Sequence, residues 1–548
     1  GIQAALDLAE MGADVHIVEK TPSIGGRMAQ LDKTFPTNDC SLCILSPKMN
    51  ECARHPGITL HMNSELERID GKPGDFLCRI RERATYVDPI KCIGCGLCEQ
   101  KCPSKVTDEF DMALRDRKAI YRYFLQSVPS TYVIDPTHCL RINKGVCGIC
   151  EKTCPAGAIN FDDTDKETEI VAGAVIIAPG IDAFNPIAYG QYGYKRYPNV
   201  VTSLEFERML CASGPQMGHV TCPKNDKEPK SVAFIQCVGS RDVENHRDYC
   251  SSVCCMYAIK EAIIAKEHIK GLDASIFFMD VRAFGKEFDK YYEKAEGQFG
   301  VEFIRSRVAD VEELSDGKIR LHYANPDGSK SARDFDLVVL SVGIQPRKDV
   351  IELSKNSQIK LDEFGFCRTG CFEPLDTSRP GVFVCGASSG PKDIPESVMG
   401  ASAAVARAVK YLGLGRQEKL SAKEFPPEKD VIGDRPRIGA FICHCGTNIG
   451  GIVDVPAVVE YTSKLKNVEH AAELLYACSG DFLEQIKKAI HDHDLNRILV
   501  AACTPRTHEP LFRETLREAG LNQYLFEMAN IRDQCSWAHM QEPEMATT

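Results

Sequence analysis

Apolar residues are arranged in short runs that alternate with amphipathic segments, a pattern typical of α/β folds. Residues 1–9 begin an amphipathic helix, and residues 15–18 follow as a short strand that ends at the acidic Glu19. Further along, the apolar run 231–236 predicts a buried strand, and residues 253–268 show a helical pattern. The sequence therefore predicts strands and helices that alternate around more than one parallel sheet.

The periodic pattern is interrupted at residues 412–436, where Gly, Lys, Glu and Pro indicate a linker. A smaller α/β module is expected after it, with strands at residues 438–442, 472–477, 497–502 and 524–528. Each of these strands is followed by cysteine, at the edge where open parallel sheets place ligands. We therefore expect one [4Fe-4S] cluster in this module, held by Cys445, Cys478, Cys503 and Cys535, with Cys443 as an alternative first ligand.

Composition narrows the functional class. The chain has 548 residues and a net charge of -11, which gives no electrostatic reason to expect nucleic acid as a partner. No apolar run approaches the roughly 18 residues of a membrane span, and no signal peptide is visible, so a cytoplasmic location is expected. The 26 cysteines, most of them in tight groups, indicate metal or redox chemistry rather than a disulfide scaffold.

The most specific motif is a duplicated cysteine run. Its first copy has the spacing C-x2-C-x2-C-x3-C-P of bacterial ferredoxins, in which the fourth cysteine binds the other cluster, and its second copy has a longer first gap. Zinc would tolerate the C-x-x-C pairs but does not explain the two Cys-Pro dipeptides. Crossed ligation predicts one [4Fe-4S] cluster on Cys92, Cys95, Cys98 and Cys154, and another on Cys139, Cys147, Cys150 and Cys102. Residues 108–127, between the two copies, are expected to form a solvated helix.

A second group of cysteines stands where a dinucleotide-binding loop is expected. The strand at 231–236 and the helix from Val253 flank a loop in which only Gly239 remains of the G-x-G-x-x-G pattern. Buried apolar thiols would be the simplest explanation. Packing does not readily explain the adjacent Cys254 and Cys255, which follow Cys250 by one helical turn. We expect a cluster here instead of NAD(P), held by Cys237, Cys250, Cys254 and Cys255.

Three further segments carry short glycine-containing patterns: Glu19 with Gly25-Gly26-Arg27, residues 175–180 and residues 381–386. They resemble the E-x(5)-GGR segment and two later segments of the glutathione and thioredoxin reductase superfamily, whose members are flavoproteins with two dinucleotide-binding domains. Gly1 would be the last glycine of an incomplete fingerprint whose first strand is absent from the sequence. Cys40 and Cys43 form a C-x-x-C pair that fits a redox dithiol and a structural thiol pair about equally well, so we do not count them as site residues.

Taken together, residues 1–407 resemble the HdrA family, the flavin-bearing subunits of heterodisulfide reductase and their relatives in anaerobic bacteria and archaea. The resemblance is carried by the GGR segment, the run Asn38 to Met49, the inserted ferredoxin, the C-x12-C-x3-CC pattern and the segment 390–396. Residues 437–537 resemble the amino-terminal module of the same family, which normally precedes the flavin domain. This order suggests a window from a longer, tandem or rearranged chain.

The resemblance implies an α/β, thioredoxin reductase-like flavoprotein in three flavin-domain segments, residues 1–85, 161–229 and 341–411. Around them we expect a ferredoxin domain at 86–160, a second Rossmann-like domain at 230–340, a linker at 412–436 and the α/β cluster module at 437–548. It implies FAD, with no catalytic side chain beyond the flavin, and FAD contacts from Gly1, Glu19, Lys20, Gly25, Gly26, Arg27, Ala178, Pro179, Gly180, Gly386 and Lys392.

The resemblance also implies an oxidoreductase component that passes electrons, with bifurcation, between a hydrogenase- or formate dehydrogenase-type donor, ferredoxin and a disulfide-reducing partner. Its partners would be those proteins and the other subunits of a heterodisulfide reductase-like complex. Two alternatives stay open: an NAD(P)H-dependent oxidoreductase like the small subunit of glutamate synthase, and a non-catalytic iron–sulfur scaffold. The first alternative needs the glycine loop that this sequence lacks.

Overall fold

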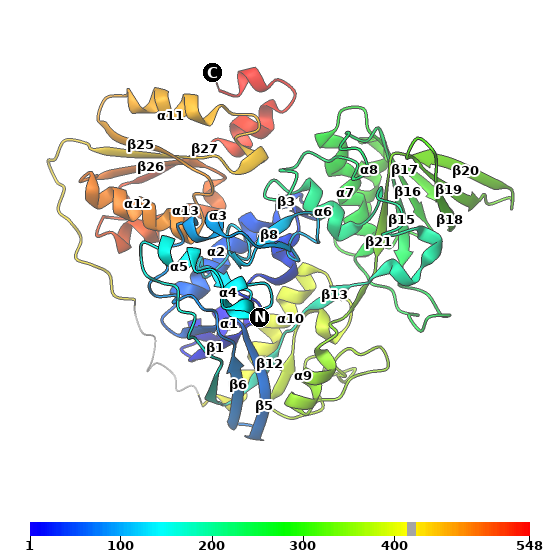
Figure 1. Ribbon diagram of the computed structural model, residues 1–548, viewed down its shortest axis with the longest axis horizontal. Coiled ribbons are helices and arrows are strands. Elements are labelled where there is room, and N and C mark those ends of the chain that lie inside the picture. The colour runs from blue at the N-terminus through cyan, green and yellow to red at the C-terminus, as the bar shows by residue number, and fades with distance from the viewer. Residues whose placement is uncertain (414–422, 548) are drawn as a thin grey trace.

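The structure is a computed structural model that describes residues 1–413 and 423–547 (Figure 1). Residues 414–422, part of the expected linker, lie outside the described residues. Within the described part, no helix is both long enough and apolar enough to cross a membrane.

The flavin-type domain is assembled from three separate segments of residues 1–411, because β11 and β12 from the middle of the range pair with β6 and β23. Parallel pairing joins β1 to β4 and β12 to β23, and the strands β5, β6 and β11 form a separate antiparallel sheet. Apolar faces of α1 and α10 pack together beside these strands. Its elements are α1 (Ile2–Glu10), β1 (Val15–Val18), β2 (Lys33–Thr34), β3 (Asp39–Cys40), α2 (Ser41–Arg54), β4 (Ile58–His61), β5 (Ser64–Lys72), β6 (Asp75–Glu82), β11 (Lys166–Ala172), β12 (Val175–Ile177), α9 (Val350–Ser357), β23 (Val382–Val384) and α10 (Ile394–Ala408).

The second dinucleotide-type domain has a five-stranded parallel sheet in the order β14-β21-β15-β16-β17. Strand β21 is buried at all six residues, because α6 and α7 cover one face of the sheet and a small antiparallel sheet packs near the other. The antiparallel pair β13 (Ile181–Ala183) and β22 (Ile344–Pro346) lies where the chain passes between the two domains. The elements are β14 (Val200–Thr202), α6 (Ser203–Leu210), β15 (Ser231–Val238), α7 (Cys254–His268), β16 (Asp273–Phe278), α8 (Phe288–Gly297), β17 (Glu302–Arg305), β18 (Val308–Glu313), β19 (Ile319–Ala324), β20 (Lys330–Phe335) and β21 (Leu337–Val342).

One feature of the second domain and one of the insert differ from the expectations. Because β14 pairs with β21, the second sheet already begins at Val200, ahead of the expected boundary at residue 230. The solvated helix expected at residues 108–127 is wrong: part of this segment forms short strands, and the side chains of Phe110, Asp111 and Phe124 are buried. The charges of the segment were misleading, since Asp111 is paired inside the protein.

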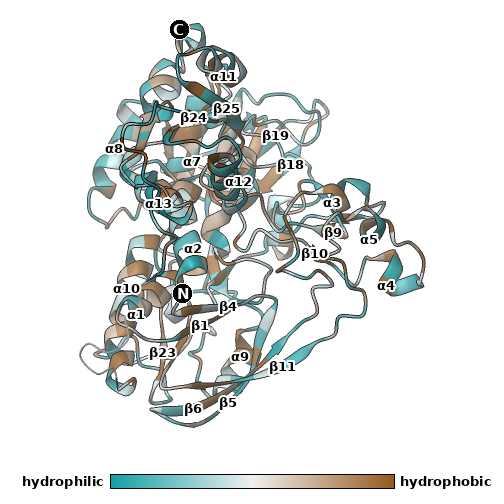
Figure 2. Cartoon of the chain, turned by 90° about the vertical axis from the view of Figure 1, so that its left-hand side faces the viewer, coloured by the Kyte–Doolittle hydropathy of each residue, from teal (hydrophilic) through white to brown (hydrophobic). Residues whose placement is uncertain are grey.

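The insert itself projects to one side of the molecule (Figure 2). Its short helices α3 and α5 pack against each other, as the two halves of a duplicated module would. Its elements are α3 (Leu97–Lys101), β7 (Lys105–Thr107), β8 (Asp116–Lys118), β9 (Ile120–Tyr121), β10 (Val133–Ile134), α4 (Leu140–Lys144) and α5 (Ile149–Thr153).

The C-terminal module is a four-stranded parallel sheet in the order β25-β24-β26-β27, and α11, α12 and α13 pack on it. One apolar cluster fills the module, with Phe441, Leu483 and Val500 almost completely buried. Helix α13 also contacts α2 of the flavin-type domain, so the module docks on that helix (Figure 1). The elements are β24 (Ile438–Cys443), α11 (Val455–Ser463), β25 (Val468–Leu474), α12 (Gly480–Asp492), β26 (Arg497–Ala502), α13 (Pro505–Glu518) and β27 (Phe526–Asn530).

Helix α6 carries a buried polar network that joins three parts of the chain. The Arg208 guanidinium, 1% exposed, donates from Nε to Asp111 Oδ1 of the insert over 2.8 Å and from Nη1 to the Gln30 carbonyl over 3.1 Å. Its neighbour Glu207 accepts from Lys260 of α7 and, over 3.0 Å, from the backbone N–H of Asp32. The network therefore fixes the flavin-type domain, the insert and the second domain to one another.

Replacing Arg208 should test this network. Arg208→Met leaves the buried Asp111 carboxylate with less compensation, and we expect a loss of about 3–5 kcal/mol in the free energy of unfolding. Removing both charges in Arg208→Met/Asp111→Leu should recover part of that loss. Arg79→Met, at the exposed Arg79–Glu169 pair, is the control and should change stability far less. Denaturant unfolding under anaerobic conditions measures the stability of all three variants. A midpoint of Arg208→Met equal to that of the wild type would contradict the role of the network.

Candidate functional site

The insert brings its cysteines into two groups. One cavity is lined by Cys102 of the first run together with Cys139, Cys147 and Cys150 of the second, the four residues that crossed ligation predicts. Burial, together with the neighbouring thiols of Cys139, Cys102 and Cys147, raises the pKa of Cys150 to about 11. These are soft donors suited to an iron–sulfur cluster, which would deprotonate them on binding.

The other group lies around α3. Burial raises the pKa of Cys98 to about 12, and Cys92 and Cys95 are among the thiols that raise it further. Cys154 packs in an apolar cluster that contains cysteines of both groups, so its place with Cys92, Cys95 and Cys98 stays a prediction from the sequence. Cys95 and Cys147, one in each group, are exposed, whereas Cys98 and Cys139 are buried.

The cysteines of the second domain meet between the end of β15 and the start of α7. Cys254 and Cys255 occupy the first turn of α7, and burial together with Cys237, Cys255 and Cys250 raises the pKa of Cys254. The backbone N–H of Ser252 donates to Cys250 Sγ over 3.4 Å. Four thiols thus converge at the strand-to-helix turn where a dinucleotide fold would hold a pyrophosphate.

Left-handed backbone recurs among the cysteines of the insert, the second domain and the C-terminal module. Cys147, Cys237 and Cys445 have φ angles of 84°, 62° and 45°. Positive φ is uncommon for residues other than glycine and carries a conformational cost, and such residues concentrate at functional sites. At all three places the positive φ directs the cysteine side chain differently from ordinary strand or helix geometry.

Several of the flavin-binding residues expected from the sequence lie at or near the carboxyl ends of the parallel strands. Ala178 follows β12 and Gly386 follows β23, and a Cβ built on Gly1 would lie 3.8 Å from the Ala178 side chain. Gly26 and Gly180 both have positive φ and open space where a side chain would begin, which fits a cradle for a large cofactor. The residues present therefore fit FAD at this edge.

Two cationic members of that set already have protein partners. Lys20 Nζ lies 3.0 Å from Asp349 and 3.2 Å from Glu65. Arg27 pairs with Asp182 over 2.8 Å. These contacts fix the directions of both side chains.

The remaining members of the set lie in the same loops or close to α10. Glu19 Oε1 accepts two hydrogen bonds from Thr21. Burial lowers the pKa of Lys392, whose ammonium donates to Ser389 ahead of α10. The last two expected residues, Gly25 and Pro179, lie beside Gly26 and Gly180.

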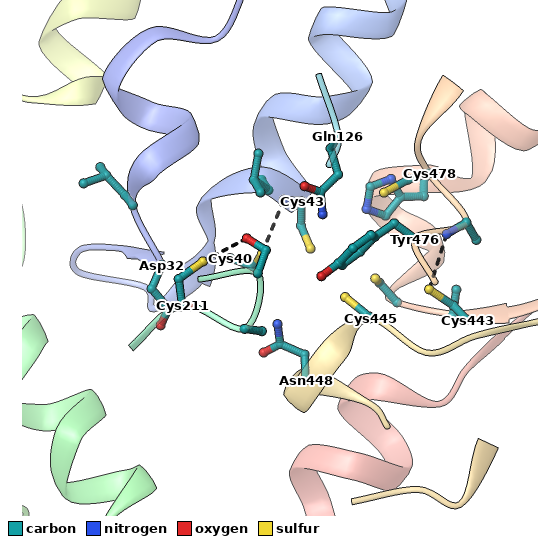
Figure 3. Close-up of a pocket in the computed structure, with 18 of the residues that line it drawn as sticks. Asp32, Cys40, Cys43, Gln126, Cys211, Cys443, Cys445, Asn448, Tyr476 and Cys478 are labelled. Carbon is teal, nitrogen blue, oxygen red and sulfur yellow. Dashed lines mark hydrogen bonds between the residues drawn. The ribbon is translucent and has the colours of Figure 1, made fainter. Parts of the chain in front are cut away.

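A fourth group of cysteines lines a cavity between the C-terminal module and the flavin-type domain (Figure 3). Cys40 and Cys43, at the start of α2, face the sheet edge of the module across the cavity. The cysteines that line it are Cys40, Cys43, Cys211, Cys443, Cys445, Cys478 and Cys503. The C-x-x-C pair of α2 was not among the expected ligands, although its spacing was a usable signal.

Hydrogen bonds across this cavity hold the two sides together. Ser46 and Asn50 of α2 donate to the carbonyl oxygen of Cys478 over 3.4 and 3.2 Å. Arg532 of the module donates from Nη1 to Cys43 Sγ over 3.0 Å. The hydrogen bond with Cys40 lowers the pKa of Cys43, but Cys503 and burial outweigh it and raise that pKa well above its usual value.

The four predicted site residues of the module do not all line the cavity. Cys445 and Cys503 are buried on it and interact with each other, and Cys478 lines it too. Cys535 lies in the helical segment Arg532–Ser536 and is not among the residues that line the cavity. His508, in the first turns of α13, also lines the cavity, although it was not counted among the expected ligands; burial and Arg532 lower its pKa to about 4.

Crossed ligation in the insert predicts a distinctive iron count. Cys102→Ser and Cys147→Ser should each remove one cluster, about four iron atoms per chain, and their combination should remove no more, because both residues serve the same cluster. Cys102→Ser combined with Cys95→Ser should instead remove about eight. Iron analysis of the reconstituted variants measures this, and the opposite pattern of the two double variants would mean that each run holds its own cluster.

The chain matches known protein families over two regions. Residues 251–408 match the family described as pyridine nucleotide-disulphide oxidoreductase, and residues 91–158 match the 4Fe-4S dicluster domain. The chain is thus an α/β flavoprotein of the thioredoxin reductase type with an inserted pair of [4Fe-4S] sites.

Curated relatives are similar over most of this chain. An iron-sulfur subunit of the CoB–CoM heterodisulfide reductase of Methanopyrus kandleri is 48% identical, over 76% of this chain and 63% of its own length. Its counterpart in Methanocaldococcus jannaschii is 44% identical, over 79% and 66%. In Methanococcus maripaludis, the corresponding subunit of the H2/formate:CoB-CoM heterodisulfide, ferredoxin reductase is 45% identical, over 74% and 62%. The match spans less than two thirds of these relatives' length. From this similarity, the chain belongs to the HdrA family of heterodisulfide reductase subunits.

Proposed function

We propose that this chain is the flavin- and cluster-bearing electron junction of a heterodisulfide reductase-like complex. FAD, when bound, supplies a carrier that exchanges electrons in pairs on one side and singly on the other, which is what bifurcation requires. The observation that carries the proposal is the position of Cys237, Cys250, Cys254 and Cys255 at the turn between β15 and α7. With thiols there, electrons would leave the flavin through iron rather than as hydride to a nucleotide.

The loop between β15 and α7 gives a further argument against the NAD(P)H alternative. Its remaining glycine, Gly239, is needed for packing, since a Cβ built on it would lie 2.2 Å from the Phe184 ring. That glycine therefore allows Phe184 to approach the strand end, instead of allowing a pyrophosphate to approach the backbone. This favours the cluster over the nucleotide at this position.

The insert supports the outward branch of the junction. Its two cysteine groups project from the body of the molecule, and each has one exposed thiol, Cys95 and Cys147. A carrier such as ferredoxin could approach them there. The relatives from Methanococcus maripaludis and Methanothermobacter marburgensis carry names that include H2 and ferredoxin. For this chain we propose as partners a hydrogenase- or formate-linked electron donor and the further subunits of the complex.

The cavity between the domains supports one more cluster in the C-terminal module. Cys445, Cys478 and Cys503 of the predicted set lie on it, and its soft, buried donor set fits iron–sulfur chemistry. That Cys535 is also a ligand remains a prediction from the sequence.

The cluster at the β15–α7 turn can be tested separately from the flavin. Cys254→Ser should lose one cluster, about four iron atoms, and its low-temperature EPR signal after reduction, while FAD content stays as in the wild type. FAD should be retained because its expected contacts lie in another domain. Cys371→Ser, which changes an exposed cysteine, is the control and should lose neither. Unchanged iron in Cys254→Ser, or stoichiometric NADPH binding to the wild type, would contradict the proposal.

A further inference from the structure

His508 is a buried imidazole without a hydrogen-bonding partner among the described residues. It is 1% exposed, and neither Nδ1 nor Nε2 has a hydrogen-bond partner there. A polar group buried in this way costs free energy unless something else satisfies it. The ring lines the cavity between the module and α2, so a group in that cavity could accept or supply the missing interaction.

The ring nitrogens of His508 lie close to two thiols from opposite sides of the cavity. One ring nitrogen, Cys43 Sγ and Cys503 Sγ all lie within 4.8 Å of one another, and all three residues are buried. Cys43 comes from α2 of the flavin-type domain, while Cys503 and His508 flank the start of α13 in the module. Cys503 packs in the same apolar cluster as Cys40 and Cys43, so the sheet edge of the module is continuous with the core around α2.

A fourth donor lies two residues after the last residue of β24. Cys445 has the left-handed backbone described above, is 9% exposed and interacts with Cys443, Cys503 and Cys40. Its thiol completes a set of three sulfur donors and one imidazole, which suits iron and other thiophilic metals. Arg532, donating to Cys43 Sγ, would offset part of the negative charge that three thiolates bring to a buried site.

We propose that Cys43, Cys445, Cys503 and His508 together hold one iron–sulfur cluster, so that the flavin-type domain and the C-terminal module share it. This inference rests on the proposed cluster of the module and changes its ligand set. Binding releases the three thiol protons and uses a lone pair of the imidazole, with no change of oxidation state. Because imidazole is neutral, the centre carries less negative charge than an all-cysteine one and has a higher reduction potential.

Selective isotope labelling tests the nitrogen ligand directly. Protein labelled with ¹⁵N only in histidine, reduced and examined by pulsed EPR, should show a ¹⁵N coupling to one cluster. His508→Cys should keep all of its iron, lose that coupling and lower the midpoint potential of this cluster alone, because a thiolate replaces the neutral ring. Absence of the coupling in the wild type, or its persistence in His508→Cys, would overturn the proposal.

Iron analysis tests the sharing of the cluster between domains. Cys43→Ser should lose one cluster, about four iron atoms, whereas Cys535→Ser should lose none. Cys52→Ser, on the same helix α2 and also buried, is the matched control and should retain its iron. Full iron in Cys43→Ser, or cluster loss in Cys535→Ser, would refute this ligand set. These readouts do not depend on the cluster that Cys254→Ser reports on, so the two proposals can fail separately.

Discussion

The relative placement of the domains depends on charges buried around α6. All eight residues of this helix are buried, including Glu205, Glu207 and Arg208. Buried charges cost free energy unless each has its partner, so the network forms only when the flavin-type domain, the insert and the second domain have all come together. Electron transfer between separate centres requires fixed distances. A network that tolerates one arrangement of domains supplies that constraint better than apolar contact, which is non-directional.

The cysteine sites follow a common construction. Each lies where a strand or loop gives way to a helix. The site in the insert has thiols from both copies of a repeat, the cavity beside α2 has thiols from segments distant in sequence, and the site at the β15–α7 turn has thiols from one short stretch of chain. Left-handed cysteines at three of them indicate that the chain accepts local strain to direct a sulfur atom inward. The surrounding sheets and helices, packed around their own apolar clusters, provide the stability that offsets this strain.

Short-range spacing made much of the fold and several sites predictable. The triads beginning at Cys92 and Cys139 and the run ending at Cys255 are recognisable because their residues are close in sequence, and the strands β15 and β24 follow from continuous apolar runs. The role of residues 108–127 was misread because a buried charge such as Asp111 has the same sequence signature as a solvated one. The approach of Cys43 to Cys503 could not be predicted, since only docking of the module on α2 brings them together.

Exposure of the two insert thiols distinguishes these centres from the enclosed ones. Cys43, Cys445 and Cys503 are shielded by two packed domains, and Cys254 is buried against the end of β21, whereas Cys95 and Cys147 reach bulk water. Dioxygen and chelators meet the sulfur atoms of the insert without any opening of the fold. If the proposed clusters are present, oxidative damage would therefore begin in the ferredoxin-like part before it reaches the inner sites, and the order in which colour fades in air would follow the depth of each site.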